Sequence, residues 1–242
     1  MGADQHFDWH GAAASALDWW ADAGVDILVD DTPRDWLAPP PAAVPKRALV
    51  EPAAVAAAAM PDDLATFLAW RGGDAVPEAA WRGATILASG PADATAMVLL
   101  DCPDRDDADE GRLLAGASGR LFDRMLAAIG LSRDEVHIAA VCVRRPVAGR
   151  LPREAEERLH DIARHHVGLV APKRLLVMGN AASRAILGAE LMATRGSLHP
   201  FAAKNGSVEV VASFHPRFLI EKPVAKAEAW RDLQLFKGGM PA

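Results

Sequence analysis

Tyrosine is absent from the 242 residues, and cysteine occurs only twice, at Cys102 and Cys142. The two cysteines form no CxxC pair, which excludes a disulfide-dense scaffold and a cysteine-based zinc site and makes a reducing cytoplasm the expected location. No stretch reaches the ~18 apolar residues that a membrane helix needs. The N-terminus lacks the basic start and apolar centre of a signal peptide. We therefore expect a cytoplasmic protein without a membrane partner.

Basic residues are in the minority, because 26 Lys and Arg stand against 32 Asp and Glu. Non-specific nucleic-acid binding depends on cations that neutralise phosphates, so this balance argues against a protein that coats nucleic acid. A local basic groove remains compatible with it. Apolar residues make up 51% and charged residues 24% of the chain. These proportions are ordinary for a globular protein, and the length suits one compact domain plus an extension.

Tryptophan and proline crowd the first 60 residues. A short helix is predicted over residues 15–23, ended by Gly24, and a proline-rich linker follows it. We expect residues 1–60 to form a Trp-rich arm with an Ala/Pro-rich linker, and residues 61–242 to form the main domain. The tryptophans either pack on that domain or bind a protein partner. They are Trp9, Trp19, Trp20 and Trp36.

From residue 62 onward, short apolar runs alternate with helical patterns. The apolar runs have no polar face, which is typical of parallel strands covered by helices on both sides. Strands are predicted over residues 95–101, 136–143, 173–179 and 208–214. Helices are predicted over residues 118–130, 153–170, 180–188 and 224–236. The sequence therefore predicts an α/β three-layer sandwich with a central four-stranded parallel sheet.

Polar residues follow each predicted strand directly. Because ligands of open parallel sheets bind beyond the carboxyl ends of the strands, these residues should meet at one edge. A histidine there either takes part in a reaction or merely caps the strand end. The residues are Asp101 after the first strand, Arg144 and Arg145 after the second, Asn180 after the third and His215 after the fourth.

Other polar groups have two interpretations each. The carboxylates after the first strand could bind magnesium or calcium, but they lack the spacing of a calcium loop, so a solvated acidic turn is favoured. Arg144 and Arg145 either grip phosphate or lie in a surface turn. The histidines of the predicted helix 153–170 are expected to be solvated. The carboxylates are Asp101, Asp104, Asp106, Asp107, Asp109 and Glu110, and the histidines are His160, His165 and His166.

Four segments match known motifs in order. They read "GRLLAGASGRLFDRMLAAIGL" (111–131), "PKRLLVMGNAASRAILG" (172–188), "RGSLH" (195–199) and "ASFHPRFLIEKPVAKAEAWRDL" (212–233). Together they resemble the uracil-DNA glycosylase superfamily, closest to its iron–sulfur bacterial type, over residues 62–236. The resemblance implies the fold of that family. It also implies that a nucleotide is flipped out of DNA and that its base is released by hydrolysis.

The resemblance also implies roles for individual residues. His215 matches the histidine that stabilises the departing base. Asp101 stands where the family has the glutamate of "GEAPG", the motif that positions the attacking water. Cys102 falls on the alanine of that motif, and Pro103 is retained. Asn180, in "GNAAS", belongs to the expected pocket because a helix N-terminus binds anions.

The chain departs from the family at several of these positions. Asp104 replaces a glycine of "GEAPG", Leu114 replaces the aromatic residue that stacks on uracil, and Ala140 replaces the asparagine that reads its polar edge. Losing a polar reader lowers discrimination strongly. Arg144 occupies a position where the family has a cysteine ligand. Since four cysteines hold the family's iron–sulfur cluster and this chain has two, we expect no cluster and no other cofactor or metal.

Three functions remain open. The first is an enzyme that removes a damaged base from DNA by N-glycosidic hydrolysis, with a modified base pocket. The second is a catalytically impaired glycosylase-fold module that binds nucleic acid or a repair partner, and the third is a structural relic. We expect a monomer that acts on single-stranded or damaged DNA, contacted by Arg144, Arg145 and Arg217. Catalysis further requires that Asp101 and His215 face each other across one cleft.

Overall fold

The computed structural model describes residues 9–22, 60–147, 149, 151–204 and 206–238. The chain forms two units, Met1–Ala54 and Val55–Ala242. In the first unit, the helix α1 spans Trp9–Asp22 and is longer than predicted. Its tryptophan side chains are exposed. Trp36 and the proline-rich linker lie outside the described residues, and the predicted boundary at residue 60 stays a prediction.

A five-stranded sheet forms the centre of the second unit, in the order β2-β1-β3-β5-β4. The four predicted strands are present and parallel to one another, which confirms the α/β class. Their bounds are β1 Ala96–Leu100, β2 Val136–Ala140, β3 Arg174–Met178 and β5 Gly206–Ser213. The side chains of β1, β2 and β3 are buried throughout, as strands covered on both faces require.

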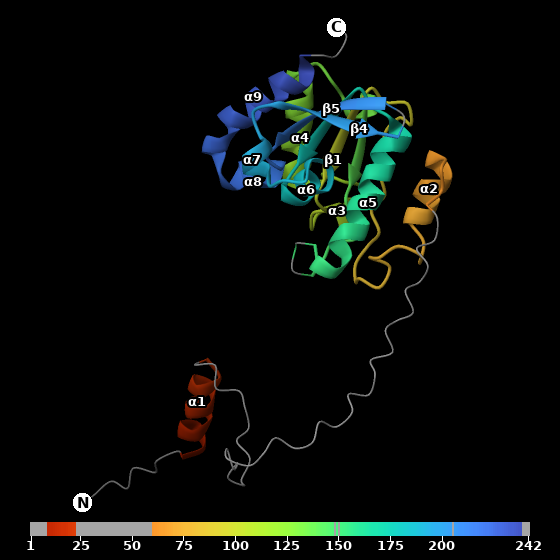
Figure 1. The fold of residues 1–242 in the computed structure, drawn as a ribbon. Helices are drawn as coiled ribbons and strands as arrows, with labels where there is room; N and C mark the ends of the chain where they lie inside the picture. Colours follow the sequence, from red (N-terminus) through yellow and green to blue (C-terminus); the bar gives the residue numbers. More distant parts are fainter. Residues whose placement is uncertain (1–8, 23–59, 148, 150, 205, 239–242) are drawn as a thin grey trace, which may run out of the picture. The chain divides into compact units, whose positions relative to one another are not determined.

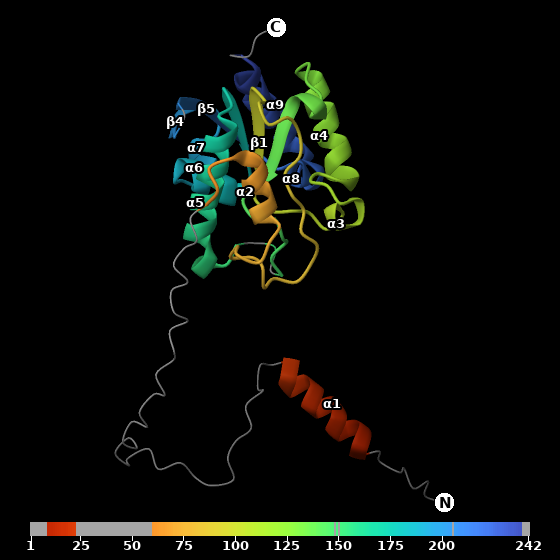
Figure 2. The same cartoon turned by 90° about the vertical axis from the view of Figure 1, so that its right-hand side faces the viewer.

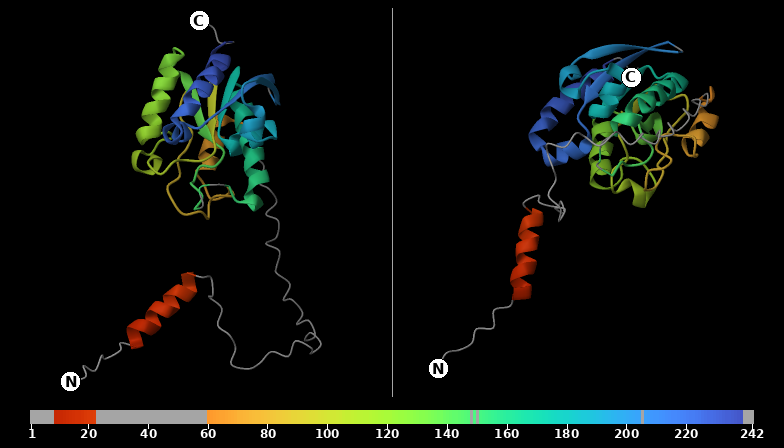
Figure 3. Two further views of the ribbon diagram at one scale, coloured as in Figure 1. Left: turned by 90° about the vertical axis from the view of Figure 1, so that its left-hand side faces the viewer. Right: turned by 60° about the horizontal axis from the view of Figure 1, so that its bottom comes forward.

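The prediction of four strands was wrong, because a fifth strand, β4 (Leu198–Ala203), pairs antiparallel with β5. Its residues alternate between partly buried and exposed, and Pro200 interrupts its apolar character. A proline removes a ladder hydrogen bond and is tolerated at a sheet edge. Figure 3 shows the β4–β5 hairpin at one edge of the sheet. A search for continuous apolar runs therefore misses this strand.

Helices cover both faces of the sheet. Figures 1 and 2 show α2 and α5 on one face and α4 and α9 on the other. The longer helices are α2 Leu64–Arg71, α4 Gly116–Ala128, α5 Arg153–Val170, α6 Asn180–Leu187 and α9 Lys226–Lys237. The short ones are α3 Asp107–Glu110, α7 Leu191–Thr194, α8 Pro216–Glu221 and the 3-10 turns η1 Arg133–Glu135 and η2 Pro223–Ala225. Among the described residues, none of the helices could span a membrane.

The prediction that the histidines of α5 are solvated was wrong. His166 is buried, and its Nε2 lies 3.0 Å from Nε2 of His137 on β2. His165 is half-buried and bonds the carbonyl of Pro61 at 2.7 Å. Position 166 falls on the apolar stripe that α5 turns to the sheet, so the helix buries an imidazole pair inside the fold. His160 is also partly buried.

Candidate functional site

Asp101 lies at the point where the strand order of the sheet reverses. β1 has β2 on one side and β3 on the other, and open α/β sheets bind ligands at this kind of switch point. The Asp101 carboxylate accepts a hydrogen bond of 2.7 Å from the amide of Ala182 in α6. Gly179 precedes that helix with φ +114°, and a Cβ there would lie 2.3 Å from Asp101 Oδ2. Glycine at 179 therefore gives the carboxylate its place against the helix N-terminus.

The Asp101 carboxyl group is largely withdrawn from water. Burial raises its pKa to about 6, while the Ala182 amide and the Arg184 charge act in the opposite direction. The group lines a cavity of about 570 Å³, together with Asn180 and Arg184. The Asn180 side chain is not free to turn, because its Oδ1 accepts from the amide of Leu191 at 3.1 Å. At neutral pH, Asp101 is a carboxylate with a raised affinity for a proton.

His215 follows β5 and begins the helix α8. Its Nδ1 accepts a hydrogen bond of 3.1 Å from the amide of Arg217. Because a backbone amide can only donate, the neutral ring carries its proton on Nε2. The residue is 9% exposed. Burial lowers the imidazole pKa to about 4, helped by the Arg217 charge, so the ring is neutral at physiological pH. Both interpretations of His215 thus stay open, since it caps α8 and also offers an N–H donor.

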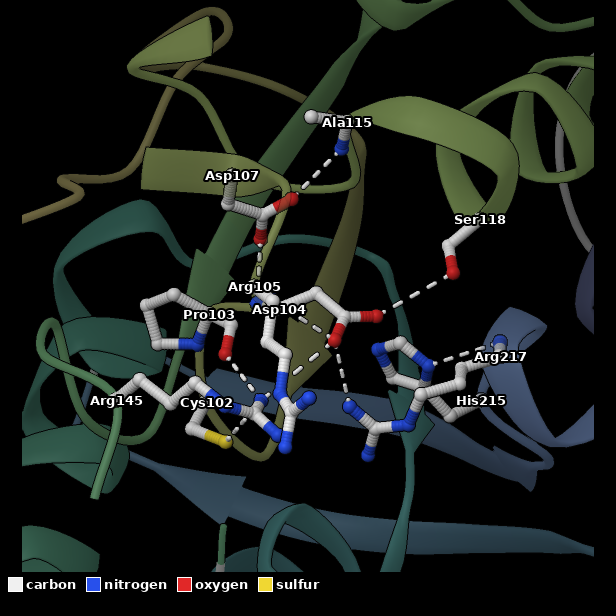
Figure 4. A network of polar contacts seen from close by, with 10 residues as sticks. All are labelled: Cys102, Pro103, Asp104, Arg105, Asp107, Ala115, Ser118, Arg145, His215 and Arg217. Atoms are coloured by element: carbon white, nitrogen blue, oxygen red, sulfur yellow. Dashed lines mark hydrogen bonds and ion pairs between the residues drawn. The ribbon is translucent and has the colours of Figure 1, made fainter. Parts of the chain in front are cut away.

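Asp104 connects the loops that follow three different strands. Its Oδ1 accepts from Arg217 Nη1 at 2.8 Å and lies 3.6 Å from Arg145 Nη1, and its Oδ2 accepts from Ser118 Oγ at 3.3 Å. Burial acts to raise the pKa of Asp104, but the hydrogen bond and charge of Arg217 outweigh it, and the pKa is lowered. Figure 4 shows the His215 ring beside this carboxylate.

Arg145 joins the loop after β2 to the loop after β1. Its Nη1 donates to the carbonyl of Pro103 at 2.8 Å and lies 3.9 Å from Cys102 Sγ. Cys102 and Pro103 are buried. The structure therefore brings Cys102, Pro103, Asp104, Arg145, His215 and Arg217 together at the predicted edge of the sheet (Figure 4).

Asp101 and His215 have different surroundings. The Asp101 carboxylate turns to α6, and the lining of its cavity does not include His215. The His215 ring lies with Asp104 and Arg217 instead. The expected single cleft between the two side chains is therefore not found in this arrangement.

Leu114 and Ala140 place apolar side chains at the two positions that contact the base in the related family. Both side chains are buried, and Ala140 is the last residue of β2. Leu114 has φ +55°, a left-handed conformation that is rare for a residue with a branched side chain. Its carbonyl accepts from Arg133 Nη2 at 2.6 Å, and only a glycine at 119 leaves room for that carbonyl. The strained loop is thus held by residues on α4 and η1.

Sequence reasoning missed the role of Asp107, which it placed among the solvated acidic residues. The side chain is buried and accepts from the amides of Asp104 at 2.8 Å and Ala115 at 2.7 Å. It closes the loop that carries Asp104. A side chain that caps a local turn commonly bonds a backbone group three residues away, as Asp107 does with Asp104. This spacing in the sequence could have indicated the role of Asp107. Glu110 similarly accepts from the amide of Gly116 at 3.2 Å.

The motif residues behind β5 support His215. Ser213 Oγ donates to Asp232 at 2.9 Å, and Arg195 Nη2 bonds the same carboxylate at 3.0 Å. The Arg195 guanidinium also lies over the ring of Phe214, 4.2 Å from its centroid. Burial raises the pKa of Asp232, against the hydrogen bonds from Ser213 and Arg195. The "RGSLH" and "AWRDL" segments therefore fix the strand end from which His215 projects.

Arg144 does not fit an iron–sulfur cluster site. Its guanidinium donates to Thr85 Oγ1 at 2.8 Å, to the carbonyl of Trp81 at 3.1 Å and to the carbonyl of Ala79. A cation that donates hydrogen bonds cannot ligate iron, and the chain has two cysteines where a four-cysteine set is needed. Because its donors are used within the protein, we do not retain Arg144 as a DNA contact.

The fold and this edge define a doubly wound α/β protein with a polar site beyond the carboxyl ends of its strands. The family described as "Uracil DNA glycosylase superfamily" matches residues 87–234, more than half of the chain. The chain therefore belongs to that superfamily.

Relatives of known name support this assignment. The chain is 28% identical over 152 residues to the type-4 uracil-DNA glycosylase of Pyrobaculum aerophilum, covering 59% of this chain and 76% of the relative. It is 27% identical over 141 residues to that of Archaeoglobus fulgidus, covering 55% and 71%. It is 26% identical over 138 residues to that of Sulfurisphaera tokodaii, covering 54% and 63%.

Proposed function

We propose that this protein removes a damaged base from DNA by hydrolysing the N-glycosidic bond, with a base pocket that differs from the uracil pocket of its relatives. The arrangement of His215 carries the proposal. A neutral imidazole whose Nδ1 is engaged has Nε2–H as its only donor. Such a donor stabilises the negative charge that develops on a departing base without first having to lose a proton.

Asp101 takes the second role. Its carboxylate is ionised above a pKa of about 6 and lines a cavity at the switch point of the sheet. A carboxylate in this state accepts a hydrogen bond from water and directs its oxygen toward the sugar carbon as the bond to the base breaks.

The ion pair between Asp104 and Arg217 controls access of the substrate to His215. Their ion pair of 2.8 Å lies beside the His215 ring (Figure 4). A DNA phosphate competes for Arg217 because guanidinium groups bind phosphate well. Opening of the pair exposes the ring to an extruded base. A carboxylate at position 104 accepts from an N–H group of a base and repels carbonyl oxygens, so it favours hypoxanthine, with one carbonyl oxygen, over uracil, with two.

The test is base release from single- and double-stranded oligonucleotides that carry uracil, hypoxanthine or xanthine, followed by alkaline cleavage of abasic sites. His215→Asn is the decisive variant, because the asparagine oxygen can still accept from the Arg217 amide and keep the cap of α8. We expect it to lower the rate at least ~100-fold while the melting temperature stays near that of the wild type. His10→Ala, on the exposed helix α1, is the matched control. Unchanged release by His215→Asn would refute the catalytic role.

A second function, a glycosylase-fold module that binds nucleic acid without releasing a base, is favoured by two observations. The His215 side chain is almost completely covered, and the apolar Leu114 and Ala140 stand at positions that read the base in the family. Under this alternative the Asp104–Arg217 pair stays closed on DNA. Binding of oligonucleotides without release of any tested base would support it against the enzyme.

A further inference from the structure

We propose that a groove beside the candidate site holds the single-stranded DNA that flanks the target nucleotide, with one base stacked on Trp81 and phosphates paired with Arg82 and Arg153. This inference rests on the proposal that the protein acts on DNA, and it names the surface that the strand follows. The groove has a volume of about 640 Å³ and is lined by Trp81, Arg82, Pro146, Val147, Leu151 and Arg153, among others.

The groove lies at the same edge of the sheet as the candidate site. Trp81 is held there by Arg144, which follows β2 and donates to the Trp81 carbonyl at 3.1 Å. Pro146 directly follows Arg145, whose guanidinium bonds Pro103 in the site. Figures 1 and 2 show the segment after α2 and the start of α5 at the same end of the domain.

The groove and the Asp101 cavity are neighbours. Leu151 and Arg153 line both of them. A nucleic-acid strand with one nucleotide in the Asp101 cavity would therefore reach the groove with the next nucleotides along its backbone. Because the two spaces share a wall, the groove is suited to the flank of the target and not to an unrelated ligand.

The Trp81 side chain is suited to stacking on a base. One part of its side chain packs against the hydrophobic core and the rest is accessible, so the indole is half-buried. Its backbone is fixed on both sides, since its amide donates to the carbonyl of Glu78 at 3.0 Å and its carbonyl accepts from Arg144. A half-buried indole on a fixed backbone can stack a base of any identity. Pro146 and Val147 extend this apolar wall, and Val147 is 95% exposed.

The charges of the groove favour a polyanion. Arg82 and Arg153 are exposed, and neither forms an ion pair within the part of the chain that the structure describes. The neighbouring Glu156 is engaged with Arg184 at 2.7 Å. Two available guanidinium groups beside an open indole are unexpected on a protein of net charge −6. An apolar peptide would use the indole and Val147 but would leave both cations without a partner.

The experiment measures binding of the full chain to labelled single-stranded DNA of normal bases, at several salt concentrations. Trp81→Ala should weaken binding roughly tenfold, and Trp81→Phe should keep most of the affinity because phenylalanine also stacks. Arg82→Gln and Arg153→Gln should each reduce the slope of log affinity against log salt by about 0.7. Trp230→Ala and Arg124→Gln are matched controls, since both residues line an apolar cavity between α4 and α9. Melting curves verify that each variant is folded.

The outcomes separate this inference from the proposed function. If the wild type releases bases and the groove variants bind and release as it does, the groove is not the DNA surface and the glycosylase proposal stands. If no base is released but binding depends on Trp81 and on both arginines, the glycosylase proposal fails and the groove stands. Charge reversal by Arg82→Glu, on the surface, is the second variant if Trp81→Ala does not fold. Wild-type affinity for DNA in Arg82→Glu would overturn the inference.

Discussion

The Asp101 carboxylate and the Ala182 amide are joined by a hydrogen bond of 2.7 Å, which ties the end of β1 to the start of α6. The same carboxylate lines a cavity and has a pKa raised to about 6 by burial. The amides at the start of α6 act to lower this pKa, and burial outweighs them. The ionised form of Asp101 is therefore disfavoured in the folded state.

Asp101→Asn should therefore stabilise the protein at neutral and higher pH. The pKa is raised from 3.8 to about 6, so the folded state favours the protonated form. The wild type loses stability as the pH rises through that interval, and the loss is complete above the folded pKa. The asparagine oxygen keeps the bond to Ala182 without the buried charge. We expect a gain on the order of 1–3 kcal/mol in the free energy of unfolding near pH 8.

Urea unfolding of both proteins at about pH 8 and at about pH 4 measures this difference. Most of the gain should disappear at the lower pH, where the carboxyl group is protonated in the folded wild type and partly protonated in its unfolded state. Base release should be lost in the same variant if Asp101 directs water. A variant that is less stable than the wild type at high pH would show that the charge supports α6.

The pH profile of base release should have one acidic limb, with its midpoint near 6. Asp101 must be ionised to orient water, and its pKa is about 6. His215 must be neutral to donate, and its pKa of about 4 keeps it neutral over that whole range. The measurement is the single-turnover rate against pH. A midpoint near 4 would assign the limb to His215 instead, and a rate independent of pH would exclude Asp101 as the group that acts on water.

Arg217→Ala should raise the pKa of His215. Burial is the main cause of the low value, and the positive charge of Arg217 is the next one. Removing that charge leaves the Asp104 carboxylate beside the ring, and a nearby anion favours the imidazolium. Titration of the His215 ring protons by NMR measures the change. The exposed Arg120→Ala is the control. If Arg217→Ala leaves the titration unchanged, the ion pair does not control the state of the ring.

Local sequence patterns predict most of the helices and strands of this fold, but they predict the site only in part. The apolar runs at residues 95–101 and 173–179 are strands because strands covered on both faces must be apolar throughout. The strand β4 was not predicted, because an edge strand needs apolar residues on one face only and forms no continuous apolar run. The rule that strand ends meet at one edge located Asp101 and His215.

The direction of each side chain could not be predicted in the same way. Asp104 meets Arg217 across 113 positions of the sequence. His166 on α5 is paired with His137 on β2, 29 positions earlier in the sequence. Such contacts depend on the relative placement of distant elements, which no local pattern contains. For the same reason, sequence alone could not show that Asp101 turns toward α6 and away from His215.

The buried pair His137–His166 should make the protein sensitive to mild acid. Nδ1 of His137 bonds the carbonyl of Pro91 at 3.0 Å, so its Nε2 must accept from His166. Burial lowers both pKa values below 6.5, and the charges of His137, Arg71 and His165 add to this for His166. The unfolded state binds protons first as the pH falls, so the stability that the neutral pair contributes is full above about 6.5 and decreases below it.

Urea unfolding at about pH 7.5 and about pH 5.5 checks this expectation. His166→Gln is the informative variant, because its amide can donate to His137 and it does not titrate. The decrease in stability between the two pH values should be smaller in this variant than in the wild type. An equal decrease in both proteins would mean that other groups, and not this pair, cause the acid sensitivity.

Arg144 should be required for the order of the segment that carries Trp81. Its guanidinium bonds Thr85 and the carbonyls of Ala79 and Trp81, so one side chain ties this segment to the end of β2. Arg144→Ala leaves these acceptors without a partner, which costs ~2–3 kcal/mol of unfolding free energy. Arg144→Lys should recover only part of it, since an ammonium group cannot reach all three acceptors in the plane of a guanidinium. Amide hydrogen exchange over residues 79–85 measures the effect, with Arg120→Ala as the exposed control. Exchange that stays at the wild-type rate in Arg144→Ala would show that the segment is held by the packing of Trp81 on the core.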